Sequence, residues 1–332
     1  MFIIEQYRPG DCVCIFGYSR GAFVARKVAS LLYHLGRSVT CESDLVQQWK
    51  IRENGVPWAV RVTPDPVPVK YLGVWDTVGR IYTPPRLSEV KDMFGIPDEE
   101  LPLGVEHALH AVAFHENRRL FRVTLFDRKK NQNNNTDLQE VWFPGAHADV
   151  GGGDRETDLS NISLNWMISK VDMFSHLKKN AVNHSTSQRL VPRDAFHETS
   201  LPKRVVDHEE TRIQSQTLRW NSEIHQTVEL LQERLPKETR LATLDDLRKT
   251  GWNRLGYIVP CSNHLKPDQE VPRSRLRLAI LPDSAPSLSQ PERRCTDPTY
   301  MRPSRPHRTR SWAMTLVVDQ FTDADGWEII KF

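Results

Sequence analysis

Residues Val13 to Phe23 read V-C-I-F-G-Y-S-R-G-A-F, an apolar run that ends in Gly17-Tyr18-Ser19-Arg20-Gly21 and leads into a helical pattern. A G-x-S-x-G motif between a strand and a helix is typical of a nucleophile elbow, which lifts a serine hydroxyl clear of a sheet. Glycines flank the serine because larger side chains would clash with the helix and the adjoining strand. The motif predicts Ser19 as a nucleophile; a purely structural turn is the alternative.

Arg20 follows the serine and begins the predicted helix. Its backbone N–H would therefore stand at a helix N-terminus, where it can hold an oxyanion. We expect Arg20 to supply this oxyanion-hole donor. Its side chain has two equally supported interpretations, contact with an anionic substrate or pairing with a nearby carboxylate.

The wider pattern alternates strands and helices over the first half of the chain. Predicted strands are Cys12–Phe16, Val67–Trp75 and Leu138–Phe143, and predicted helices are Arg20–Leu35, Val105–Phe114 and Ser160–Phe174. Short, almost continuously apolar strands separated by helices favour a parallel sheet with right-handed crossovers and with helices on both faces. The sequence therefore predicts an α/β fold.

Polar clusters follow two further predicted strands, as Ser19 follows the first. Asp76 comes directly after Trp75, and His147 lies in a glycine-rich turn after Phe143. Open α/β sheets bind ligands at the carboxyl ends of their strands, and a serine needs a base that a carboxylate holds in one tautomer. We therefore predict a triad of Ser19, Asp76 and His147. Asp149 is the rival acid and His115 the rival base, while capping and turn roles are the structural alternatives.

The composition narrows the class of protein. The chain has 332 residues, 39% of them hydrophobic, and a net charge of +3, which gives no global argument for nucleic acid binding. Its five cysteines show no zinc spacing and indicate a reducing compartment. No apolar run is long enough to span a bilayer, and the start lacks a signal-peptide pattern. We expect a cytoplasmic protein with no metal and no cofactor.

The second half of the chain is more polar. We divide the chain into a catalytic core (1–175), a helical and loop extension (176–257), a poorly ordered Pro/Arg-rich segment (258–310) and a C-terminal β-hairpin (311–332). The extension contains one predicted helix, Glu223–Leu235. Gly151-Gly152-Gly153 resembles an anion-binding nest but fits a turn better. A phosphate-binding or nucleotide module built on it is therefore the weakest functional hypothesis.

Three motifs together resemble a known family: Gly17–Ala22, Leu72–Val78 and Phe143–Gly152, supported by the stretches His107–Phe121 and Leu159–Met167. They resemble the type VI secretion phospholipase effector-like catalytic domain, formerly a domain of unknown function, which has many fungal members. The resemblance covers about residues 5 to 172 in the family's order.

The resemblance implies an α/β hydrolase that cleaves phospholipid acyl esters with a Ser-Asp-His triad, here Ser19, Asp76 and His147. It implies a lipid or small-molecule ester as substrate and allows transient membrane contact, and it names no protein partner. His115 stands where the family usually has an acidic residue. Family members also have strands before the elbow, one of whose loops supplies a second oxyanion donor, whereas this sequence begins shortly before Ser19.

We therefore expect a partial, N-terminally truncated α/β-hydrolase-like sheet with a polar, loop-rich C-terminal region. Two functions compete. One is a serine hydrolase of carboxylic esters, phospholipase- or lipase-like. The other is a catalytically impaired remnant that acts as a binding or interaction protein and keeps the elbow for folding alone.

Overall fold

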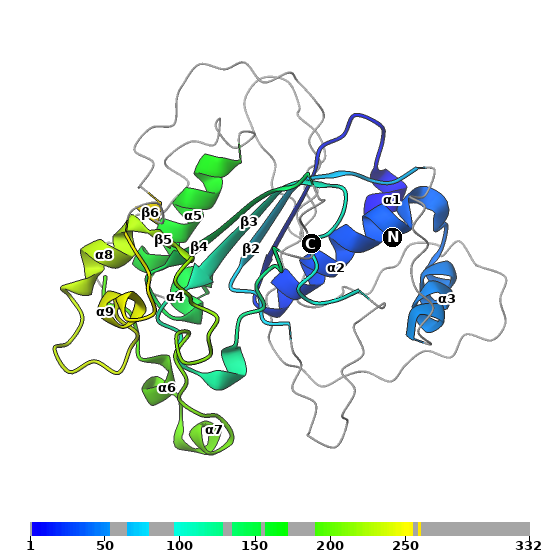
Figure 1. Cartoon of the computed structure of the whole chain (residues 1–332). Coiled ribbons are helices and arrows are strands. Elements are labelled where there is room, and N and C mark those ends of the chain that lie inside the picture. The colour runs from blue at the N-terminus through cyan, green and yellow to red at the C-terminus, as the bar shows by residue number, and fades with distance from the viewer. Residues whose placement is uncertain are drawn as a thin grey trace, which may run out of the picture.

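The computed structural model describes residues 2–53, 65–79, 96–128, 135–153, 157–171, 190–254 and 258–259. Its centre is a six-stranded sheet in which every strand is parallel to its neighbours, in the order β1-β2-β3-β4-β5-β6 (Figure 1). Helices lie on both faces of this sheet. The predicted α/β architecture with a parallel sheet is confirmed.

The strands are β1 (Val13–Tyr18), β2 (Val69–Trp75), β3 (Val105–Ala113), β4 (Asp137–Phe143), β5 (Glu223–His225) and β6 (Ile258–Val259). The helices are α1 (Phe2–Gln6), α2 (Arg20–His34), α3 (Glu42–Glu53), α4 (His147–Gly151), α5 (Asp158–Lys170), α6 (Ala195–Glu198), α7 (Leu201–Val206), α8 (Gln226–Gln232) and α9 (Leu244–Arg248). Two 3₁₀ turns, η1 (Gly36–Ser38) and η3 (Arg119–Phe121), complete the described elements.

The register brings the carboxyl ends of the strands to one edge of the sheet. Tyr18 at the end of β1 pairs with Trp75 at the end of β2, and Ala113 in β3 pairs with Phe143 in β4. The polar residues that follow β1, β2 and β4 therefore leave the sheet at the same edge, within the width of four neighbouring strands. The three predicted strands are confirmed, with boundaries moved by one or two residues.

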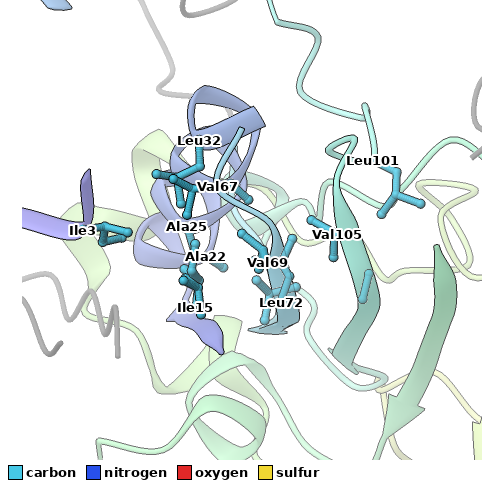
Figure 2. Close-up of a cluster of buried hydrophobic side chains, with 14 of the residues drawn as sticks. Ile3, Ile15, Ala22, Ala25, Leu32, Val67, Val69, Leu72, Leu101 and Val105 are labelled. Atoms are coloured by element: carbon cyan, nitrogen blue, oxygen red, sulfur yellow. The ribbon is translucent and has the colours of Figure 1, made fainter. Parts of the chain in front are cut away.

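Alternate side chains of the strands build separate cores on the two faces. Ile15 and Leu72 pack with Ala22 and Ala25 of α2 on one face (Figure 2). Cys14 and Tyr71 face the other way and pack in a cluster with Trp166 of α5. A third cluster, beside the first on the α2 face, joins the far strands to α8 and α9 through Trp142, Ile224, Val228, Leu244 and Leu247. Apolar residues in near-continuous runs are what a sheet covered on both faces requires.

The prediction of a helix over Val105–Phe114 was wrong, because this stretch forms β3. Its sequence V-E-H-A-L-H-A-V-A is apolar at helical spacing but also nearly continuously apolar, and a short run of this kind suits a buried strand equally well. Burial decides the outcome: Ala108 to Ala113 are all buried, on both faces of the sheet.

The predicted helix over Glu223–Leu235 is partly wrong. Glu223–His225 form β5, and only Gln226–Gln232 are helical. Ile258–Val259, at the start of the segment predicted to be poorly ordered, form β6. The sheet thus continues past residue 175, while the proposed division of the chain into four parts stays a prediction. The predicted hairpin, and the end of the helix predicted over Ser160–Phe174, lie outside the described residues.

Within the described ranges, none of the helices combines the length and the apolar character that crossing a bilayer requires.

Candidate active site

Ser19 sits in a sharp turn between β1 and α2. Its φ of 59° is rare for a residue other than glycine. The Ser19 N–H donates to the carbonyl of Trp75, and the Ser19 carbonyl accepts the N–H of Val78, so the turn is tied to the end of β2. At Gly17, an added Cβ would lie 2.4 Å from the carbonyl oxygen of Gly21. The expected steric reason for glycine before the serine is therefore present in the structure.

Asp76 follows β2 directly and is completely buried. Its N–H donates to the carbonyl of Ala111, and its Oδ1 accepts the N–H of Ala113 at 3.1 Å. Both contacts are to β3, the neighbouring strand. The carboxylate therefore has a defined position above the carboxyl ends of β2 and β3.

His147 begins the short helix α4, where the sequence predicted only a glycine-rich turn. Gly145, with φ 117°, turns the chain after β4, and an added Cβ would lie 2.4 Å from Cβ of Asp149. The His147 N–H donates to Oε2 of the buried Glu116 at 2.9 Å. The backbone of His147 is thus held from one side by its own loop and from the other by Glu116.

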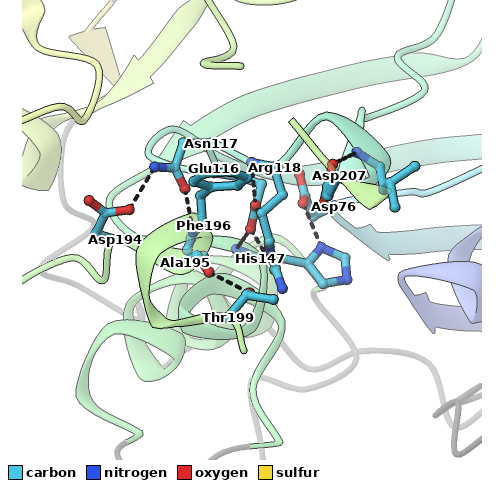
Figure 3. A network of polar contacts seen from close by, with 12 residues as sticks. Asp76, Glu116, Asn117, Arg118, His147, Asp194, Ala195, Phe196, Thr199 and Asp207 are labelled. Atoms are coloured by element: carbon cyan, nitrogen blue, oxygen red, sulfur yellow. Dashed lines mark hydrogen bonds and ion pairs between the residues drawn. The ribbon is translucent and has the colours of Figure 1, made fainter. Parts of the chain in front are cut away.

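These three residues meet in one chain of hydrogen bonds. His147 Nδ1 lies 2.7 Å from Oδ2 of Asp76, and His147 Nε2 lies 2.8 Å from Oγ of Ser19. Because an ionised carboxylate only accepts, Nδ1 carries the proton. Nε2 is then left with a lone pair directed at the Ser19 hydroxyl. Figure 3 shows the imidazole of His147 directed at Asp76.

Arg212 is a member of the site that the sequence did not reveal. Its Nη2 donates to both carboxylate oxygens of Asp76, at 3.1 and 2.9 Å. Burial by itself would raise the pKa of Asp76, but the Arg212 charge and the bond from His147 outweigh burial and hold this pKa at about 2. Asp76 is therefore ionised at neutral pH although no solvent reaches it.

Asp149, the rival acid, contacts other groups. Its Oδ1 accepts the Arg193 Nε–H at 2.6 Å, and its Oδ2 accepts the N–H groups of Ala146 and Arg193. It thus organises the loop that carries His147 at the point where α4 begins. The carboxylate at the imidazole is that of Asp76.

The comparison with known families covers the same half of the chain as the site. The sequence profile of the catalytic domain of the Tle1-like phospholipase effectors of the type VI secretion system matches residues 1–57 and 43–170, together just over half of the 332 residues. The chain belongs to this family. The profile spans Ser19, Asp76 and His147 and ends before Arg212.

One curated relative gives a shorter match. The uncharacterized protein YEL023C of Saccharomyces cerevisiae is 46% identical over 43 residues, which are 11% of this chain and 6% of that protein. The match thus spans a small fraction of the length of that relative. No solved structure matches the chain.

His115, the rival base, has a structural role in this Tle1-like domain. Its Nδ1 accepts the Gly145 N–H at 2.9 Å, and burial lowers its pKa to about 3. The neutral ring is hydrogen-bonded to the loop that leads to His147. Just after β3, His115 therefore serves as a hydrogen-bond acceptor for the loop.

Aromatic rings and a buried ion pair surround the imidazole of His147. The rings of Tyr18 and Phe121 lie 4.6 and 5.0 Å from it, centroid to centroid. The Arg118 guanidinium lies over Phe121 and forms two hydrogen bonds with Glu116, the residue that accepts the His147 N–H. This wall keeps His147 only 5% exposed while Ser19 stays half-buried.

A second buried histidine–carboxylate pair lies beneath the first. Nδ1 of His110 in β3 is 2.9 Å from Oε2 of Glu140, and its Nε2 accepts the Thr77 N–H at 3.2 Å. Thr77 directly follows Asp76, so this pair supports the turn that carries the acid. No feature of the sequence distinguished His110 from a core residue.

Two other features of the domain are not joined to the triad. A cavity of about 700 Å³ is lined by Val78, Leu120 and Trp142 together with charged residues, and none of the three triad residues lines it. Ligand atoms of Asp194, His197 and Glu209 lie within 4.8 Å of one another. Asp194 caps α6, and Arg240 Nη1 contacts His197 Nε2 at 2.8 Å, so a cation would meet a positive charge there.

Proposed function

We propose that the chain is a serine hydrolase of carboxylic esters, of the phospholipase or lipase type, with Ser19 as nucleophile, His147 as base and Asp76 as orienting acid. The observation that carries the proposal is the pair of hydrogen bonds on His147, 2.8 Å to the Ser19 hydroxyl and 2.7 Å to Asp76. A serine hydroxyl becomes nucleophilic when a base in the correct tautomer accepts its proton.

In the first half-reaction, Ser19 Oγ attacks the ester carbonyl carbon while its proton passes to Nε2 of His147. The tetrahedral intermediate collapses, the bond to the alcohol oxygen breaks, and that oxygen takes the proton from Nε2. The acyl group remains on Ser19. In the second half-reaction, water loses a proton to Nε2 and attacks the acyl carbon. The bond between this carbon and Ser19 Oγ then breaks, Oγ takes the proton back from Nε2, and the carboxylic acid leaves.

The negative charge that develops on the carbonyl oxygen needs N–H donors. Arg20 is the first residue of α2, and the amides at a helix start have no acceptor within the helix. The positive end of the helix dipole supports an anion at the same place. We assign the Arg20 N–H as the oxyanion donor, as the elbow motif predicts.

Arg212 is a positioning residue in this proposal. Asp76 must stay ionised although its side chain is fully buried, and burial opposes ionisation. The two bonds from Arg212 Nη2 and the bond from the Ala113 N–H offset this cost and fix the carboxylate plane toward His147. Arg212 belongs to the extension that follows residue 175, so that extension contributes to the site.

The family supports a lipid ester as the substrate class, since its profile is that of phospholipase effectors. We propose a lipid or smaller carboxylic ester as the substrate. The cytoplasmic location stays a prediction.

A fluorophosphonate probe tests the proposal directly, because it phosphonylates a serine only where a base and an oxyanion site are in place. We expect the purified chain to be labelled at Ser19, identified by mass spectrometry, and Ser19→Ala to remain unlabelled. A folded chain without any label would instead favour the binding or interaction protein. Substrate assays on phospholipids and short-chain esters would follow a positive result.

A further inference from the structure

Helix α7 exposes three large apolar side chains. Leu201 is 73% exposed, Val205 82% and Val206 73%, the highest values among the exposed large hydrophobic residues of the described chain. Residues four apart lie on one face of a helix, so Leu201 stands beside Val205, and Pro202 beside Val206. The result is a continuous apolar strip on a six-residue helix.

The charges of α7 have one sign. Lys203 and Arg204 belong to the helix, and no acidic residue does. Arg204 is turned back toward the protein, where its Nε donates to the carbonyl of Thr199 at 2.7 Å, whereas Lys203 is exposed. An apolar strip beside the exposed cationic side chain of Lys203 suits a surface that is apolar inside and anionic at its boundary.

The helix is tied to the wall of the candidate active site. Directly after α7, the buried Asp207 accepts the Leu120 N–H at 2.9 Å, and the carbonyl of His208 accepts the Arg119 N–H. The next residue along, Phe121, packs on the imidazole of His147. Figure 3 shows Asp207 in the same network as His147 and Asp76, and Figure 1 shows α7 beyond the carboxyl ends of the strands.

We propose that α7 docks the protein onto the surface of a membrane that contains anionic lipids. This inference rests on the proposed function, since a hydrolase of lipid esters must meet its substrate at a bilayer. The size of the strip favours a bilayer over a protein partner. The helix has six residues and is only about 9 Å long. Each side of a stable protein interface contributes roughly 20–30 residues, several times as many.

Vesicle sedimentation tests the docking without catalysis. We would use the full chain carrying Ser19→Ala, with vesicles of phosphatidylcholine alone or mixed with phosphatidylglycerol. We expect binding to the mixed vesicles and a fall in partitioning of at least about tenfold for Val205→Ser/Val206→Ser, because two apolar side chains no longer enter the interface. Lys203→Glu should weaken binding to the mixed vesicles by about fivefold or more.

Leu230→Ser is the matched control, since Leu230 is 59% exposed on a different helix, α8. It should bind as the parent does, and thermal unfolding should show all variants equally folded. Lack of binding by the parent, equal binding by the valine variant, or equal loss in the Leu230 control would overturn the proposal. A dimer that the valine variant loses in the absence of lipid would assign the strip to a second copy and overturn it too.

The proposed hydrolase function and the proposed membrane docking can be tested independently of each other. Fluorophosphonate labelling of Ser19 in the absence of lipid reports the catalytic centre, whereas sedimentation of the Ser19→Ala chain reports α7 alone. Vesicle binding without labelling would retain the docking surface and reject the hydrolase. Labelling without vesicle binding would do the reverse.

Discussion

The described part of the chain contains two buried histidine–carboxylate pairs: His147 with Asp76, which lie past the ends of β4 and β2, and His110 with Glu140, which lie within β3 and β4. Their Nδ1–oxygen distances are similar, 2.7 and 2.9 Å. They differ at Nε2, which faces the half-buried Ser19 hydroxyl in one pair, whereas in the other it accepts the N–H of Thr77 and also lies 3.2 Å from the fully buried Thr77 hydroxyl. A carboxylate on one nitrogen therefore does not make a base; the group on the other nitrogen decides what the imidazole can do.

Position along the strand explains this difference. His110 lies within β3, where both of its ring nitrogens meet buried groups, the Glu140 carboxylate on one side and the N–H and hydroxyl of Thr77 on the other. His147 lies past the end of β4, level with the turns that follow β1 and β2. The position of His147 gives its imidazole access to the half-buried Ser19 hydroxyl and, in the proposed function, to substrate. The position of His110 gives its imidazole a structural role under the Asp76–Thr77 turn.

Replacement of the two histidines should separate these roles most clearly. We expect His147→Gln to lower ester hydrolysis by roughly a millionfold, as loss of the base in such a triad does, and the double variant with Ser19→Ala to hydrolyse esters no more slowly. Labelling of Ser19 by the fluorophosphonate should fall strongly in His147→Gln as well. His110→Gln should cost about 1–3 kcal/mol in the free energy of unfolding, since it weakens buried hydrogen bonds. Labelling kinetics and urea unfolding measure the two effects. Equal loss of labelling in both variants would refute the distinction.

The two acids should differ in the same sense. Asp76→Asn should lower the rate by about ten-thousandfold, because an amide no longer enforces the Nδ1–H tautomer or stabilises the imidazolium. Glu140→Gln retains an acceptor for the Nδ1–H of His110, so we expect less than about a tenfold loss, mediated by the turn. Steady-state hydrolysis of a short-chain ester compares them. A larger loss in Glu140→Gln than in Asp76→Asn would place the base elsewhere.

Arg212 gives the Asp76 pair a cation, and its removal tests what that cation does. Arg212→Met should lower the rate by about tenfold to a hundredfold and cost roughly 3–5 kcal/mol of stability, because a buried carboxylate loses its countercharge. The pKa of Asp76 should rise from about 2, since burial is then less opposed.

The pH–rate profile distinguishes this role from a merely structural one. In the parent, the pKa of Asp76 is held at about 2, so Asp76 does not contribute to the acid limb in the neutral and mildly acidic range. In Arg212→Met, protonation of Asp76 should add a second group to that limb. Arg212→Lys, which keeps the charge, should restore the simple limb; identical profiles in all three proteins would contradict the positioning role.

The sequence pointed to Ser19, Asp76 and His147, the residues of the proposed triad, because each of them follows an apolar run and precedes a turn. It predicted β1, β2 and β4 for the same reason. It missed β3, whose apolar pattern suits a helix and a buried strand equally. It missed β5 and β6 because three and two residues are too few to show any period.

The long-range polar contacts could not be predicted from the sequence, for a different reason. Arg212 and Asp76 are 136 residues apart, and Arg212 lies in a polar stretch with no local sign of burial. Glu116 and His110 lie in the stretch His107–Phe121 that supported the family resemblance, but only the packed structure shows which backbone groups they hold. The apolar strip of α7 was missed because a six-residue helix gives too short a pattern.

A third histidine, His115, sharpens the comparison through stability rather than chemistry. Burial lowers its pKa to about 3, so the folded protein leaves it neutral where the unfolded chain, with a pKa near 6.5, already binds a proton. Its contribution to stability is complete above about pH 6.5 and is lost as pH falls toward 3. As pH falls from about 6.5 to about 4.5, the free energy of unfolding should therefore decrease by about 2–3 kcal/mol less in His115→Gln than in the parent. Urea unfolding at several pH values measures this difference. His107→Gln, at a half-exposed position in β3, is the control for the loss of a histidine side chain. Parallel stability curves for His115→Gln and the parent would mean that His115 is protonated in the folded state, and that the loop before His147 is held by a charged ring instead of a neutral acceptor.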